Sequence, residues 1–244
     1  MYIDAHCHIG DFAPVITGGD HDETELTGEH AAEEIRCGVF SVLDTHDHTG
    51  ANERARKACE ASDGRLVAYI YLNPMDVESA LAELERCRQF DCFRGVKLHS
   101  AIDQYYPFMK TYFPLYERIN ELRLPVLWHS GTSPTSHPLQ IAYVARQFPD
   151  SPHILGHFGL SDLTWECFPA ADLAPNIHVD TTANPIVPVM ADWIREFGAE
   201  RMLWGSDFPF YDVRYEKLKV DCLRVTDREK ELIAGENAAR IFRL

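Results

Sequence analysis

Short apolar runs alternate with amphipathic helical patterns along the whole chain. Each run has the length of a buried strand, and a segment with helical periodicity follows it. A chain that repeats strand and helix in this way predicts a parallel sheet covered by helices. The predicted strands are Tyr2–His8, Val39–Thr45, Leu66–Leu72, Gly95–His99, Pro125–Ser130, His153–His157, Ile177–Thr181 and Met202–Asp207.

Boundary signals mark several of the helices. Asp76 can cap a helix over Val77–Phe90, and Thr226-Asp227-Arg228-Glu229 has the form of a capping box for a last helix that ends near Phe242. Glycines stand at three expected helix ends, namely Gly38, Gly64 and Gly198. We therefore expect residues 1–244 to form one domain, a closed (β/α)₈ barrel, with a doubly wound sheet as the alternative.

Polar residues gather at the carboxyl ends of the predicted strands. In a (β/α)₈ barrel these ends meet on one face, which carries the active site. The strand starts are apolar, so the pattern is not one of scattered histidines. The residues concerned are His6, His8, His46, Asp47, His48, Tyr71, Asn73, Lys97, His99, His129, His157, Asp180, Thr182 and Asp207.

Strand alternation selects a candidate metal site from this set. Asp4, His6 and His8 should share one face of the first strand, because residues two apart point to the same side. By the same rule Leu127 shares a face with His129, Leu155 with His157, and Leu203 and Gly205 with Asp207. The first and last strands are neighbours in a closed barrel, and His129 reaches in from across it. Three histidines and one carboxylate form a mixed site with room for water, as in catalytic zinc sites.

The motifs that carry these residues resemble the amidohydrolase superfamily. The likeness is closer to the amidohydrolase-related branch that includes aminocarboxymuconate semialdehyde decarboxylase, and it covers nearly the whole chain. The resemblance implies a (β/α)₈ barrel in which His6, His8, His129 and Asp207 bind the metal. It also implies that His157 transfers a proton or polarises the substrate. The matching segments are Asp4–His8, Gly95–His99, Leu124–Gly131, Leu155–Gly159, Gly205–Pro209 and Glu236–Arg240.

The chemistry of the ligand set fits these roles. A divalent ion lowers the pKa of bound water, and Asp207 can accept a proton from that water. One ion is expected, with Zn²⁺ as the first choice. In this superfamily a lysine at the position of Lys97 can be carboxylated and bridge two metals, but the resembled branch usually holds one. Lys97 then pairs with substrate or with Asp4.

Loops at the carboxyl face are expected to form the substrate pocket. The segment Ile9–Gly28 has little regular pattern and is predicted to be a long loop, often a lid in such barrels. Lys97, His99, Tyr105 and Phe208 are the predicted substrate contacts. His46 and His48 match no metal motif and are assigned to the loop or the substrate. His137, His153 and His178 are expected to be structural.

Composition limits the kinds of partner that this protein is expected to bind. The formal charge of −15 disfavours nucleic acid, and no apolar run is long enough to cross a bilayer. Seven cysteines without a C-x-x-C pair indicate reduced thiols and a cytoplasmic protein. The expected partner is a small, partly apolar molecule. Barrels of this type often form homodimers, although the sequence does not indicate the oligomeric state.

Three functions remain open. A metal-dependent hydrolase would act on an amide, lactone or ester, and the short chain and the few arginines near the site favour this choice. A non-oxidative decarboxylase of an unsaturated or aromatic acid is the alternative that the closer branch suggests. The third is a barrel that binds metal without catalysis, which the complete set of acid, base and ligand positions disfavours.

Overall fold

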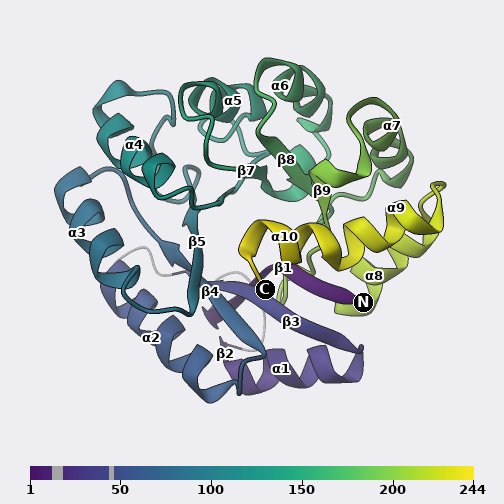
Figure 1. The fold of residues 1–244 in the computed structure, drawn as a ribbon, viewed down its shortest axis with the longest axis horizontal. Coiled ribbons are helices and arrows are strands. Elements are labelled where there is room, and N and C mark those ends of the chain that lie inside the picture. The colour runs from purple at the N-terminus through teal and green to yellow at the C-terminus, as the bar shows by residue number, and fades with distance from the viewer. Residues whose placement is uncertain (13–18, 44–46) are drawn as a thin grey trace.

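A computed structural model describes residues 1–12, 19–43 and 47–244, which form a curled sheet ringed by helices (Figure 1). The strand order is β2-β1-β3-β4-β5-β6-β7-β8-β9, and every pairing is parallel except that of β2 with β1. The strands are β1 (Tyr2–Asp11), β2 (Asp20–His21), β3 (Ile35–Val42), β4 (Leu66–Tyr71), β5 (Phe93–Leu98), β6 (Val126–Trp128), β7 (His153–Leu155), β8 (Ile177–Asp180) and β9 (Met202–Leu203).

Hydrogen bonds from the segment after β9 close the sheet onto β1. Trp204 O accepts from Ala5 N at 3.0 Å, Asp207 N donates to His6 O at 2.7 Å, and His8 N donates to Phe208 O at 2.7 Å. The predicted (β/α)₈ barrel is therefore confirmed, with the short strand β2 added to it.

Helices follow the strands around the outside of the ring, except α10, which lies over its centre (Figure 1). They are α1 (Glu23–Ala32), α2 (His48–Ala61), α3 (Val77–Cys87), α4 (Phe113–Glu121), α5 (Pro138–Gln147), α6 (Cys167–Leu173), α7 (Val187–Phe197), α8 (Val213–Cys222), α9 (Asp227–Glu231) and α10 (Asn237–Phe242). Asp76 caps α3, and Thr226 and Glu229 form the predicted capping box of α9. A π-helical turn, η5 (Leu232–Glu236), links α9 to α10.

Two apolar clusters hold the barrel. The inner one contains alternate residues of the strands, including Ile3, Val39, Leu127 and Leu203, and α10 packs against it. Figure 1 shows α10 lying over the centre of the ring, beside β1. The outer cluster fills the space between strands and helices, with Val126, Trp128, Met202 and Trp204 among its members. None of the helices in the described ranges is both long and apolar enough to cross a membrane.

Three expectations about local structure are wrong. The predicted loop Ile9–Gly28 includes residues 13–18, which lie outside the described residues. Its described part is more regular than predicted, because β1 continues to Asp11, β2 pairs back onto it, and Asp22 caps α1. Gly38 does not end a helix but lies inside β3. Leu155 belongs to the outer cluster, and its neighbour Ile154 faces the barrel interior, since β7 ends before the turn that carries His157.

Candidate active site

A β-bulge in β1 sets the direction of the two leading histidines. The pairing of β1 with β3 slips between Asp4 and Cys7, where two residues of β1 stand opposite one of β3, so that β1 carries one extra residue. Ile3 and Ala5 face the inner cluster before the slip, and Cys7 and Ile9 face the outer one after it. The expectation that Asp4 shares a face with His6 and His8 is therefore wrong, because the bulge reverses the alternation.

His6, His8 and Asp207 come together at the barrel centre. Their ligand atoms all lie within 4.8 Å of one another, and all three residues are buried. Asp207 Oδ1 is 3.3 Å from His8 Nε2 and 3.7 Å from His6 Nε2. Two imidazoles and a carboxylate are suitable donors for Zn²⁺ or Mn²⁺. The donor set thus fits a divalent ion between the first and last strands.

The other ring nitrogens of both histidines have fixed partners. His6 Nδ1 lies 2.8 Å from Asp180 Oδ2, and His8 Nδ1 lies 2.9 Å from Ser41 Oγ. A carboxylate that accepts from Nδ1 leaves the lone pair of Nε2 directed at the site, as in carboxylate–histidine–metal arrangements. In the structure Lys97 Nζ donates to His6 Nε2 at 3.1 Å. The expected pairing of Lys97 with Asp4 is not formed.

Burial keeps the imidazoles of the site neutral. It lowers the pKa of His6, His8, His99 and His157 well below the usual range, with nearby Lys97 or histidines adding to the effect. Burial is also the main reason that the pKa of His129 falls to about 3 and that of Lys97 to about 8. Neutral imidazole is the form that binds metal. Burial raises the pKa of the Asp207 carboxyl.

His157 stands beside this group on a strained turn. Its Nδ1 is 3.8 Å from Asp207 Oδ2 and 3.0 Å from Thr182 Oγ1. The turn has positive φ at His157 (65°), Phe158 (45°) and Leu160 (51°), a conformation that costs free energy in residues other than glycine. Asn184 Nδ2 shares its two hydrogens among the backbone carbonyls of all three residues, whose oxygens lie within 3.4 Å of it. The turn aims His157 at Asp207.

His129 lies beyond His157 as seen from the proposed ion position. Its Nδ1 is 3.0 Å from His157 Nε2, and its Nε2 is 2.8 Å from Thr132 Oγ1. Its ring stacks on His99 with the centroids 4.1 Å apart. The structure thus brings three of the four expected ligands together, and His129 stays a predicted fourth.

Comparison with known proteins agrees with this geometry. The model of the amidohydrolase family matches residues 3–244. The chain belongs to the amidohydrolase family. Gamma-resorcylate decarboxylase of Polaromonas sp. (strain JS666 / ATCC BAA-500) is 24% identical to this chain over an alignment 280 residues long, gaps included. The alignment covers 90% of this chain and 86% of that protein.

Solved structures of other proteins share the fold of this amidohydrolase. One is a dihydroxybenzoic acid decarboxylase from Polaromonas sp. JS666, solved with bound manganese and the inhibitor 2-nitroresorcinol. It superposes with a TM-score of 0.79 at 18% identity, and the superposition covers 100% of this chain and 97% of that one. A putative 2-pyrone-4,6-dicarboxylic acid hydrolase from Pseudomonas putida gives 0.74 at 19% identity, covering 99% and 97%.

A cavity of about 390 Å³ opens above the site of this amidohydrolase. The predicted contacts Lys97 and His99 line it, but Tyr105 and Phe208 are not among its lining residues. Tyr105 is buried edge-to-face against Tyr112, and Phe208 is buried next to His21. The described lining residues are His8, Leu43, Lys97, His99, Ile102, His129, His157, Leu160, Ala183, Asp207, Phe210 and Tyr211.

The remaining predicted residues lie around this cavity or away from it. His46 lies outside the described residues, and His48 begins α2, with its ring 4.8 Å from that of Tyr71. His153 is structural as expected, since its Nδ1 accepts from Trp128 Nε1 in the outer layer. From the first loop, Phe12 packs on the cavity residue Phe210 with ring centroids 4.9 Å apart.

Sequence reasoning gave no role to three residues that hold the site. Asp180 had a usable signal, because it is a carboxylate at a strand end, but its partner His6 is distant in sequence. Ser41 and Asn184 gave none, since a serine within an apolar strand and an asparagine in a loop are ordinary. Their roles depend on which segments the closed barrel brings side by side.

Proposed function

We propose that this protein is a non-oxidative, divalent-metal-dependent decarboxylase of a small aromatic acid. The observation that carries the proposal is the position of His157, with Nδ1 3.8 Å from Asp207 Oδ2 and access to a cavity whose walls include Leu43, Ile102 and Phe210. The curated relatives that match most of the chain are gamma-resorcylate decarboxylases, which supports the same chemistry.

The proposed ion is held by His6, His8 and Asp207, with His129 as a further predicted ligand. Mn²⁺ is the first ion to test, because it is bound in the decarboxylase structure from Polaromonas, whereas the sequence had favoured Zn²⁺. An ion at this position would supply positive charge to hold the carboxylate and a ring hydroxyl of the substrate. We retain one ion as the proposal. That ion would take the place of Lys97 Nζ at His6 Nε2 and leave the Lys97 ammonium free for the substrate.

The protein side chains then account for the remaining steps. Decarboxylation of an aromatic acid requires a proton on the ring carbon that bears the carboxylate. The carbon–carbon bond then breaks, its electron pair restores the aromatic ring, and CO₂ leaves. We assign delivery of this proton to His157, which is neutral at rest, takes the proton from the Asp207 carboxyl, whose pKa burial raises, and passes it to the ring carbon. Ile102, Leu160 and Phe210 hold the ring, and Lys97 offers an ammonium group to a substrate oxygen.

Hydrolysis is the second candidate. The sequence favoured it, and the likeness to a putative pyrone dicarboxylic acid hydrolase supports it. The same ligand set serves either reaction, because Asp207 can accept a proton from a water that attacks a lactone. The relatives that are similar in sequence favour decarboxylation instead, so hydrolysis takes second place.

The two reactions are separated by their products. The Mn²⁺-loaded protein is incubated with ortho-hydroxylated benzoic acids and, separately, with lactones and esters in ¹⁸O-labelled water. The proposal predicts release of CO₂ from a hydroxybenzoic acid. Label from water in a lactone or ester product, without CO₂ release from any acid, supports the hydrolase. Metal binding with neither reaction supports a barrel without catalysis.

A further inference from the structure

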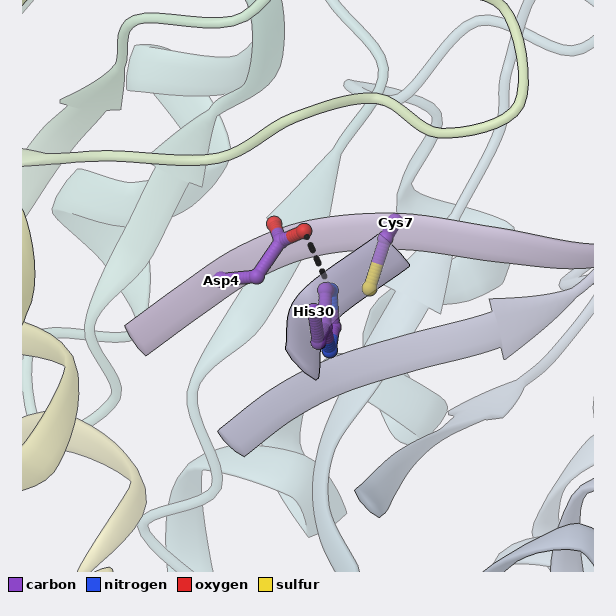
Figure 2. Close-up of side chains that lie close together, drawn as sticks. All are labelled: Asp4, Cys7 and His30. Atoms are coloured by element: carbon purple, nitrogen blue, oxygen red, sulfur yellow. Dashed lines mark hydrogen bonds and ion pairs between the residues drawn. The ribbon is translucent and has the colours of Figure 1, made fainter. Parts of the chain in front are cut away.

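We propose that His30, on α1, is a positioning residue for the metal ligands and acts through Asp4. The inference rests on the proposed metal site and extends it to the layer between the barrel and its helices. His30 is nearly fully buried, and its Nε2 lies 3.0 Å from Asp4 Oδ2. Figure 2 shows Asp4 and Cys7 extending from β1 toward the His30 ring.

The Asp4 carboxylate joins the two ends of the barrel. Its Oδ1 accepts from His6 N at 3.2 Å and from Ser206 N at 2.9 Å. Its Oδ2 accepts from Ser206 Oγ at 2.5 Å and from His30. The bonded residues include the ligand His6 and the neighbour of the ligand Asp207. One carboxylate therefore fixes the first strand and the last strand at the point where both present ligands.

The bulge in β1 explains why this carboxylate is needed. A bulge leaves a backbone group without its partner in the sheet ladder. Asp4 supplies the acceptor for His6 N. His6 O in turn accepts from Asp207 N at 2.7 Å, so the backbones of the two ligands are also bonded to each other. A rotation of the Asp4 carboxylate would move His6 and Asp207 relative to one another.

His30 is the donor to Asp4 that comes from outside the barrel wall. The space for its ring depends on Gly38, where a Cβ atom would lie 2.6 Å from His30 Cε1. His6 and Ser206 hold the carboxylate from within the barrel seam, while His30 holds Oδ2 from the helix layer. Loss of this donor would leave the Asp4 carboxylate held only from the barrel seam, by His6 N, Ser206 N and Ser206 Oγ, and would let it shift away from the helix layer. Cys7 Sγ lies beside them but donates to Val39 O at 3.7 Å.

The Mn²⁺ affinity and the electron paramagnetic resonance spectrum of bound Mn²⁺ test this inference. His30→Leu removes the donor, whereas His30→Gln keeps an N–H donor on a side chain of similar length. Loss of a partner that orients metal ligands typically weakens binding roughly 10–100-fold. We therefore expect His30→Leu to raise the Kd for Mn²⁺ by a factor in this range and to change the spectrum, and His30→Gln to restore both in large part.

Two further variants separate positioning from general destabilisation. Leu26→Val removes a buried methylene from the same helix, and it should lower the Tm while leaving the Kd and spectrum unchanged. Asp4→Asn should reproduce the effect of His30→Leu, and it replaces that variant if His30→Leu does not fold. An unchanged Kd and spectrum in His30→Leu, or in Asp4→Asn where that variant replaces it, contradicts the inference alone. A wild-type protein that binds neither Mn²⁺ nor Zn²⁺ contradicts the proposed function as well.

Discussion

The imidazole of His6 has partners on both ring nitrogens, and this arrangement was only half predictable. Its place at the end of the first strand, two residues before His8, follows from the sequence. The sequence does not indicate its two partners, which are Asp180 at 2.8 Å from Nδ1 and Lys97 at 3.1 Å from Nε2. Side chains at strand ends can be predicted from strand alternation, but contacts between strands depend on how the barrel closes.

Replacement of His157 tests its role as the proton donor. We expect His157→Asn to lower kcat roughly 10²–10⁴-fold, the usual contribution of a positioned acid or base. The Kd for Mn²⁺ should change by less than about 3-fold, because His157 is assigned to proton transfer and not to the metal. Steady-state kinetics and metal titration measure the two quantities.

His137→Asn is the matched control for this variant. His137 lies at the start of α5, bonded to Glu166 Oε1 at 2.9 Å, and is not part of the cavity wall. It should retain wild-type kcat and metal affinity. A His157→Asn variant with wild-type kcat would remove His157 from the proposed reaction.

At the scale of elements, the turn over η2 (Gly156–Gly159) depends on one asparagine. Asn184 is fully buried, and the two N–H groups of its amide are shared among the carbonyls of His157, Phe158 and Leu160 and Thr164 Oγ1. These bonds compensate for the positive φ angles of the turn, which cost about 1–3 kcal/mol for each residue. The asparagine thus maintains a conformation that the turn would not adopt by itself.

Asn184→Ala should therefore affect both stability and catalysis. Leaving the buried carbonyls without their donor costs about 1–3 kcal/mol in the free energy of unfolding. We also expect kcat to fall at least about 10-fold, because His157 would no longer be held in line with its target, while the Kd for Mn²⁺ stays near that of the wild type. Urea unfolding and kinetics measure both effects. A loss of stability without any change in kcat would show that the turn does not need Asn184 to place His157.

Among the helices and strands, the pattern of apolar residues could predict some features and not others. The strand order and the helix caps at Asp76 and Thr226 followed from periodicity and side-chain chemistry. The bulge in β1 and the end of β7 at Leu155 did not, because a bulge leaves no mark in a run of apolar residues. Both errors occur where the backbone departs from regular geometry to aim a histidine.

For the whole molecule, buried histidines predict sensitivity to acid. Burial lowers the pKa of His153 to about 3, from an ordinary value of 6.5. Below pH 6.5 the unfolded chain binds a proton at His153 that the folded protein does not, so stability is lost as the pH falls toward 3. Each pH unit in this range costs about 1.4 kcal/mol, or about 2–3 kcal/mol by pH 4.5.

A variant isolates this contribution from that of the other histidines. His153→Asn keeps an acceptor for Trp128 Nε1 and cannot be protonated in this range. Urea unfolding at pH 7 and pH 4.5 should show a smaller loss of stability in the variant than in the wild type, by about 2–3 kcal/mol. Equal losses in the two proteins would mean that His153 does not contribute to acid unfolding.

The most direct test of the proposed function follows the proton that replaces the carboxylate. The Mn²⁺-loaded protein is incubated in D₂O with an ortho-hydroxylated benzoic acid, and the product is examined by NMR and mass spectrometry. The account predicts one deuterium at the vacated ring carbon for each CO₂ released, with both lost in His8→Ala and in metal-free protein. Absence of CO₂ and of ring deuterium with every aromatic acid tried, in protein that holds its metal, would contradict it.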